Sequence, residues 1–113
     1  MTAIVSVYAT FGSEAEARRI ARTCIEERLA ACANVWPIAS IYRWQGAIEE
    51  AQEFAALFKT SAERAEALIA RIGALHSYDV PAAVVWPIPD ALCDYADWVK
   101  DETAGASREG HSC

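Results

Sequence analysis

The sequence predicts a single α+β domain in which one antiparallel sheet carries two helices on the same face, in the chain order β-α-β-β-α-β. Three patterns indicate this order: an alternating strand near the start, a long β-type stretch with a central turn, and two stretches with helical spacing of apolar residues. This order is the split βαβ arrangement. The 113 residues, of which 54% are hydrophobic and 23% charged, suit one hydrophobic core.

The chain begins with a strand and an amphipathic helix. Residues 4–10 alternate in polarity, and Phe11 and Gly12 are expected to break this strand. Ser13, followed three residues later by Glu16, forms a capping box at the start of a helix. Apolar residues then recur with helical spacing at Ala17, Ile20, Ala21, Cys24 and Ile25. We expect this helix to end at residues 29–31.

The middle of the chain predicts a β-hairpin. Residues 32–48 form a β-type stretch that contains Pro37, which must lie at an edge, a bend or a bulge because proline donates no ladder hydrogen bond. Gln45 and Gly46 are typical of a hairpin turn, and residues 53–60 continue as the second strand. On that strand Glu53 and Lys59 share one face.

The second half of the domain predicts a helix, a strand and a short last helix. Thr60 and Glu63 suggest another capping box before an apolar stripe that ends near His76; its members are Ala65, Leu68, Ile69, Ile72 and Leu75. Residues 80–88 are rich in β-branched side chains and contain two prolines, which suggests an edge strand or one that leaves the sheet early. Asp90 is expected to cap the last helix. The domain is predicted to span residues 1–103, followed by a polar tail over 104–113.

The charge and the chain start exclude some partners. Ten Lys and Arg against 16 Asp and Glu leave a formal net charge of -6, which repels nucleic acid. The start lacks a signal-peptide pattern, and no apolar run approaches the ~20 residues that span a bilayer. We therefore expect a cytoplasmic protein with no nucleic-acid or membrane partner. The four cysteines lack CxxC spacing, and reduced thiols are expected.

The face of the sheet opposite the two helices is expected to be apolar. Ile41, Tyr42 and Trp44 lie close together on the predicted hairpin, so that aromatic and aliphatic groups occupy both of its faces. An exposed surface of this kind needs a cover. Self-association with closed cyclic symmetry is the common solution.

Four stretches resemble the CutA family of divalent-cation tolerance proteins. They are EERLAACANVWPIASIYRWQGAIEE at residues 26–50, EFAALFKTSAER at 53–64, LHSYDVP at 75–81, and the pair Tyr95 and Trp98. They look like the family signatures ERLAAC-N, S-YxWxG, E-x-E, KT, H-P-Y-x-x-P and YxxW. The resemblance covers residues 5–98.

The resemblance implies a ferredoxin-like subunit in a homotrimer, with long strands that form extended inter-subunit sheets. The family is similar in architecture to the trimeric PII signalling proteins, whose ligands bind in clefts between subunits. The family is named for tolerance to divalent cations, copper included. A metal ligand, copper or another divalent cation, is therefore the cofactor that the resemblance suggests.

His76 is the candidate metal ligand that the resemblance implies. The sequence departs from the family pattern around it: Ala9, Leu75, Ser77 and Ala82 stand where members can carry Cys, His, Pro and Glu. The alternative is a histidine that hydrogen-bonds a partner at a helix C-terminus. His111 and Cys113 in the tail are a further candidate metal pair, with a plain tail as the alternative.

A candidate small-ligand site collects aromatic and charged residues of the hairpin and the later segments: Trp44, Glu53, Lys59, Tyr78, Tyr95 and Trp98. The alternative for the aromatic residues is packing between the subunits of an oligomer. Lys59 stands beside a predicted helix N-terminus, which suits an anion. Its alternative is a salt bridge to Glu53.

The sequence therefore predicts a trimeric divalent-cation tolerance protein that binds or responds to copper and has no catalytic activity. A GxSxG motif and a Gly-rich phosphate loop are both absent from the sequence, and only one His lies inside the predicted domain. One alternative is a PII-like sensor that binds a small anion in inter-subunit clefts. The other is a small ferredoxin-like enzyme that depends on His76 or Tyr78.

Overall fold

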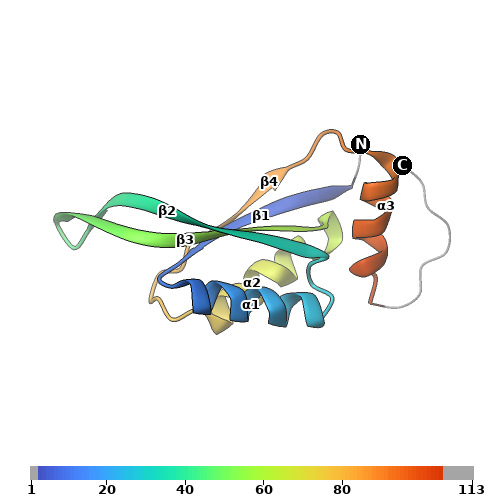
Figure 1. The fold of residues 1–113 in the computed structure, drawn as a ribbon. Helices are drawn as coiled ribbons and strands as arrows, with labels where there is room; N and C mark the ends of the chain where they lie inside the picture. Colours follow the sequence, from blue (N-terminus) through green and yellow to red (C-terminus); the bar gives the residue numbers. More distant parts are fainter. Residues whose placement is uncertain (1–2, 106–113) are drawn as a thin grey trace.

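The computed structural model describes residues 3–105 of the chain. In chain order the elements are β1 (Ile4–Phe11), α1 (Glu14–Glu26), β2 (Cys32–Trp44), β3 (Ala47–Ser61), the 3-10 turn η1 (Ala62–Arg64), α2 (Ala65–Leu75), β4 (Ala83–Pro87) and α3 (Cys93–Glu102). Figure 1 shows α1 and α2 on one face of the sheet and α3 at one end of it. The predicted α+β fold class and element order are confirmed.

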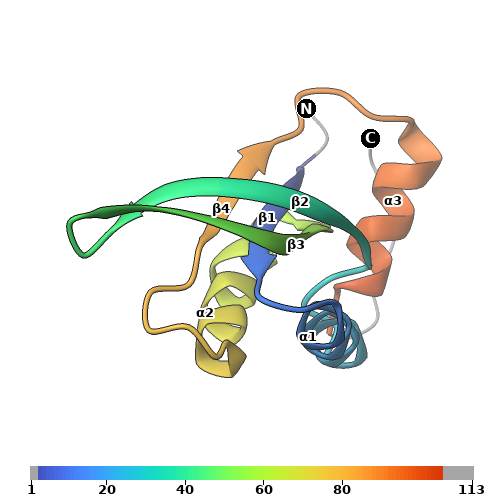
Figure 2. The same cartoon turned by 60° about the vertical axis from the view of Figure 1, so that its left-hand side comes forward.

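The four strands form one antiparallel sheet in the order β2-β3-β1-β4. β1 pairs with residues 54–61 of β3, whereas residues 47–53 of β3 pair only with β2. The far half of the β2–β3 hairpin therefore extends as a two-stranded ribbon beyond the rest of the sheet, as Figures 1 and 2 show. β2 and β4 are the edge strands, so of the alternatives left open by the sequence, Pro37 lies on an edge strand and the residue 80–88 segment supplies one.

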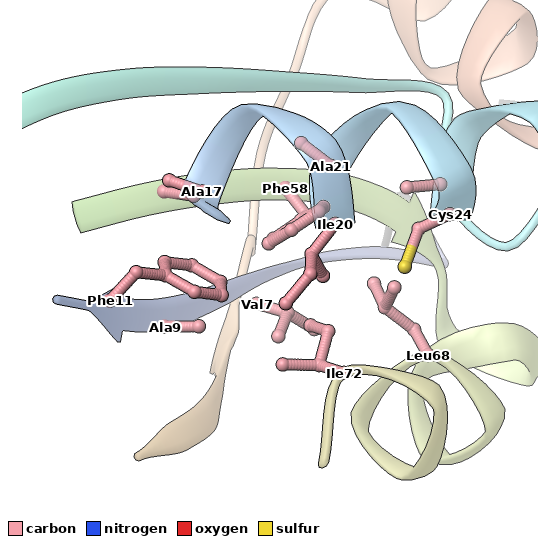
Figure 3. Close-up of a cluster of buried hydrophobic side chains, with 12 residues drawn as sticks. Val7, Ala9, Phe11, Ala17, Ile20, Ala21, Cys24, Phe58, Leu68 and Ile72 are labelled. Carbon is pink, nitrogen blue, oxygen red and sulfur yellow. The ribbon is translucent and has the colours of Figure 1, made fainter. Parts of the chain in front are cut away.

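The main core lies between the sheet and the two helices. Val7, Ala9 and Phe11 of β1 pair with Phe58, Ala56 and Phe54 of β3 and share their face of the sheet. Figure 3 shows that side chains of α1 and α2 meet them there, including Ile20, Cys24, Leu68 and Ile72. The apolar stripes predicted for both helices supply this core. Ile25 is the exception, because it lies at the exposed edge of its stripe.

A smaller core holds α3 in place. Ile4 and Ala31 pack with Ala96 and Val99 of that helix. The helix ends at Glu102, with Thr103 as its C-cap. Residues 106–113 of the predicted tail, with His111 and Cys113, lie outside the described residues.

The helix starts agree only in part with the capping predictions. The Ser13 side chain accepts a hydrogen bond from the backbone N–H of Glu16, so the predicted cap of α1 is confirmed. Thr60 does not cap α2, because β3 continues to Ser61 and the Thr60 hydroxyl donates to the carbonyl of Leu29. The predicted Asp90 cap is also wrong, since Leu92 occupies the N-cap position of α3.

Strand ends also differ from the predictions for identifiable reasons. Phe11 belongs to β1, because its ring is buried in the core and pairs opposite Phe54. α1 ends earlier than expected, at Glu26, and Arg28 takes a positive φ of 61° shortly after it. The predicted Gln45–Gly46 turn is confirmed, with φ values of 49° and 85° that suit a tight hairpin turn.

The buried Cys24 thiol is expected to make the fold less stable at alkaline pH. Burial raises the pKa of Cys24 to about 11, and the nearby Glu27 carboxylate adds to the shift. Because the unfolded thiol ionises near its ordinary pKa of 9.0, ionisation favours unfolding once the pH exceeds that value. The stabilisation at this site is therefore present below pH 9 and is lost as the pH rises through 11. The thermal midpoint of unfolding should decrease more between pH 8 and pH 11 in the wild type than in Cys24→Ala. An equal decrease in the two proteins would contradict this expectation.

Candidate functional site

An open cleft of about 880 Å³ lies between the hairpin and the loop that follows α2. Its lining comes from three parts of the chain: β1, the β2–β3 hairpin and residues 78–82. Register explains the hairpin's share, because Ile38, Ser40, Tyr42 and Trp44 alternate along β2 on the face that they share with Glu53 of β3. Three of the predicted ligand residues, Trp44, Glu53 and Tyr78, therefore lie together in this cleft.

Tyr78 and Glu53 form the main polar contact of the cleft. The Tyr78 hydroxyl donates to Oε2 of Glu53 at 2.7 Å, although the two residues lie on different segments. Burial raises the pKa of Tyr78 well above its ordinary range, and the hydrogen bond to Glu53 raises it further. The phenol therefore stays protonated at neutral pH and acts as a donor. Gly12 makes room for it, since a Cβ at that position would lie 3.0 Å from the Tyr78 hydroxyl oxygen.

His76 lies behind Tyr78 with a fully buried side chain. It is the C-cap residue of α2, and its ring stacks on Phe11 at a centroid distance of 4.8 Å. The backbone N–H of Tyr78 donates to Nδ1 at 3.1 Å, so Nε2 carries the proton and donates to the carbonyl oxygen of Thr10 at 2.7 Å. Both ring nitrogens are therefore used in positioning the loop, which agrees with the alternative interpretation of His76.

Glu16 ties the same loop to α1. Its two carboxylate oxygens accept from the backbone N–H and the hydroxyl of Ser77, at 2.8 and 2.9 Å. A proline at position 77, as in the family pattern, would have neither donor. The departure at Ser77 therefore adds two hydrogen bonds that hold the loop against the helix. The sequence suggested Glu16 only as a capping residue.

The residues around His76 do not fit a metal ion. Coordination requires a ring nitrogen with a free lone pair, but Nδ1 accepts from Tyr78 and Nε2 is protonated. The carboxylate of Glu16 lies 3.8 Å from Nδ1 and is already shared with Ser77. Over residues 3–105 the structure contains no group of three or more His, Cys, Asp or Glu residues placed to hold a metal.

The remaining predicted ligand residues lie at the other end of the sheet. Lys59 is six residues from Glu53 along β3, a separation of about 20 Å. The alternative of a salt bridge between them is therefore wrong. Lys59 pairs opposite Cys32, whose Sγ lies 3.4 Å from the hydroxyl oxygen of Tyr95. Tyr95 contacts Trp98 at a ring-centroid distance of 5.8 Å.

This second cluster has its own electrostatics. Burial raises the pKa of Tyr95 to about 12, with the hydrogen bond to Cys32 as the next cause. Cys24 and Cys32 are free thiols, as expected. The predicted six-residue ligand set is thus divided between two places on one chain.

Tyr8 and Asp79 also line the cleft, although the sequence alone did not single them out. Tyr8 lines the cleft from β1 and stacks on Trp86 of β4 at 4.7 Å, with Trp36 of β2 at 6.2 Å on its other side. The sequence signal that could have identified Tyr8 was its position on the polar side of an alternating strand. The three aromatic residues come from three strands, so only the sheet order brings them together.

The family model described as CutA1 divalent ion tolerance protein matches residues 5–102. A divalent-cation tolerance protein CutA from Thermus thermophilus is 46% identical over 98 residues, covering 86% of this chain and 95% of the relative. The structure of a periplasmic divalent cation tolerance protein CutA from Archaeoglobus fulgidus superposes with a TM-score of 0.87 at 38% identity, covering 88% of this chain and 98% of that one. A CutA structure from Synechococcus elongatus also has a TM-score of 0.87, at 33% identity over 91% of this chain and 92% of the other.

Proposed function

Because the chain belongs to the CutA1 divalent ion tolerance family, we propose that it acts as a homotrimer that serves divalent-cation tolerance by binding a small ligand, without catalytic turnover. The observation that carries the proposal is the apolar surface that a single chain leaves exposed on the sheet and on its long hairpin. A surface of this extent indicates a partner, and closed cyclic assemblies are the usual outcome for identical chains.

The hairpin supplies the first part of that surface. Residues 47–53 pair only with β2, and an isolated two-stranded ribbon has little stability in water. Apolar side chains nevertheless occupy both sides of this ribbon: Ile41 and Ile48 share one face and are 70% and 64% exposed, and Tyr42 and Trp44 share the other and are each 43% exposed. Pairing or packing against neighbouring subunits would bury these groups and support the ribbon.

The sheet face opposite α1 and α2 supplies the second part. Trp36, Tyr8 and Trp86 form a row across β2, β1 and β4, and both tryptophans remain substantially exposed. Tyr and Trp are enriched at protein interfaces, where a large apolar area is buried. α3 covers only one end of the sheet, as Figure 2 shows.

The hydrogen bonds made by the His76 ring favour a binding function over a catalytic one. Among the described residues it is the only imidazole, and both of its nitrogens take part in structural hydrogen bonds. It is therefore not placed to accept a proton from a substrate. Because His76 also fails the test as a metal ligand, direct copper coordination by this residue is not part of the proposal.

A PII-like sensor of small anions has less support than a binder of other ligands. The cleft is lined by the carboxylates of Glu53 and Asp79, and no Lys or Arg of the described residues lines it. Lys59, the residue that suggested an anion, lies outside the cleft.

The proposed assembly is tested by measuring the mass in solution by light scattering, with and without copper(II). We expect the mass of three chains in both conditions, and the same result for a version that ends at Thr103. A monomer at micromolar concentration would contradict the proposal. A trimer that forms only with copper would contradict the view that the apolar surface drives assembly.

A further inference from the structure

Hydrogen bonds tie the loop that follows α2 to the end of β1 and to the start of α1. Nε2 of His76 donates to the carbonyl oxygen of Thr10, near the end of β1, and Nδ1 accepts from the backbone N–H of Tyr78. Glu16, in the first turn of α1, accepts from both the backbone N–H and the hydroxyl of Ser77. These contacts lie on the helix side of the sheet, because the His76 ring stacks on Phe11 of the main core.

The His76 ring has no lone pair left for a metal ion. A backbone N–H can only donate and a backbone carbonyl can only accept, so Tyr78 and Thr10 together fix the neutral tautomer with its proton on Nε2. A metal at Nδ1 would displace the Tyr78 N–H, and a metal at Nε2 would replace the proton that Thr10 accepts. Either exchange leaves a backbone group without its partner, which costs free energy.

The surroundings of the ring supply too few further ligands. Ala9 is fully buried in the main core and Leu75 packs against it, so neither position offers a coordinating atom. The Glu16 carboxylate lies 3.8 Å from Nδ1, but both of its oxygens already accept hydrogen bonds from Ser77. Zinc and copper sites in proteins use about three or four ligands that converge on one point. The residues at this position therefore favour a fixed loop over a metal site.

We propose that His76 is the positioning residue of a loop lock and that it binds no metal ion in this chain. The loop lock consists of the hydrogen bonds that His76 and Glu16 make with Thr10, Ser77 and Tyr78. It holds the loop so that the Tyr78 hydroxyl reaches Glu53 of β3. The inference rests on the proposed function in one respect, the divalent cations that the protein serves, and it implies that these ions are bound away from His76.

The metal part of the proposal is tested by NMR on the His76 ring in the full chain. The sequence contains two histidines, His76 and His111, so isotope-labelled histidine gives two sets of ring signals, which His111→Gln assigns. At neutral pH we expect His76 to be the neutral tautomer protonated at Nε2. One equivalent of zinc(II) or copper(I), both diamagnetic, should leave its two ring-nitrogen shifts unchanged. A different tautomer, or a saturable shift of either nitrogen with either ion, would overturn the inference.

The positioning role is tested by hydrogen exchange at the backbone N–H of Tyr78. His76→Asn keeps an acceptor at the place of Nδ1, whereas His76→Gln keeps a donor at the place of Nε2 and loses that acceptor. We expect exchange at Tyr78 to be about tenfold faster in His76→Gln than in His76→Asn, whose rate should stay close to that of the wild type. Equal rates in the two variants would show that the ring only fills space.

A variant of Glu16 keeps the proposal testable if both changes at His76 disturb folding. Glu16→Ala removes the acceptor of the Ser77 N–H, so exchange at Ser77 should become about tenfold faster. Glu14→Ala is the matched control, because Glu14 lies in the same turn of α1 and bonds Arg18 instead of the loop. Unchanged exchange at Ser77 in Glu16→Ala would refute the loop lock. A trimer in which His76 binds metal would refute this inference alone, whereas a monomer with a metal-free, Nε2-protonated His76 would refute only the proposed assembly.

Discussion

Replacing Phe58 with alanine is expected to lower the free energy of unfolding by about 3–5 kcal/mol, the usual cost of removing a large buried ring. Phe58 is fully buried at the centre of the main core, where Figure 3 shows it between the strands and α1. Its ring faces Val7 of the neighbouring strand through the sheet register. The helices and the sheet cannot both close on the space left by the ring, so a cavity remains.

The measurement is urea unfolding followed by circular dichroism, at one protomer concentration for all variants because association also contributes to stability. Leu92→Ala is the control, since Leu92 is 82% exposed and its truncation should change stability by less than about 0.5 kcal/mol. A Phe58→Ala protein as stable as the wild type would mean that this core is not the main source of stability.

Replacing Trp86 with glutamate is expected to convert the proposed trimer into single chains. Trp86 is 47% exposed on the sheet face opposite α1 and α2, stacked against Tyr8. If three chains bury this face, the substitution places an unpaired carboxylate in an apolar interface, which costs several kcal/mol in each copy. Light scattering should then give the mass of one chain instead of three.

Ala70→Glu is the matched control for this experiment. Ala70 is exposed on α2, on the helical side of the molecule, so the same charge is introduced away from the proposed interface. The control should keep the wild-type mass. A trimer that persists in Trp86→Glu would show that the aromatic face is not the surface on which the chains meet.

The candidate site was predictable where one strand carries its residues and unpredictable where segments meet. Glu53 and Trp44 could be assigned to one face because side chains alternate along the hairpin. Tyr8 could not be assigned with them, because its contact with Trp86 depends on β4 pairing beside β1. Lys59 was grouped with Glu53 since both share a face, but the length of β3 separates them.

His76 shows a second limit of the sequence. Its position at the end of α2 was predicted from the apolar stripe before it, and a metal role was suggested by the family resemblance. The tautomer of its ring is decided by Thr10 and Tyr78, which approach from a strand end and from the following loop. Hydrogen-bond partners that lie 66 residues apart leave no local signal in the sequence.

The sequence alone determined the element order, the helix-facing apolar stripes, the hairpin turn and the edge position of β4, because these follow from short-range periodicity and from the backbone limits of Gly and Pro. The tertiary structure alone decided which carboxylates meet which donors. Glu16 bonds Ser77, and Glu53 bonds Tyr78, only after the loop behind α2 has packed against β1 and β3. Such contacts depend on distances between segments far apart in the chain, and those distances are set by the packing of the whole core.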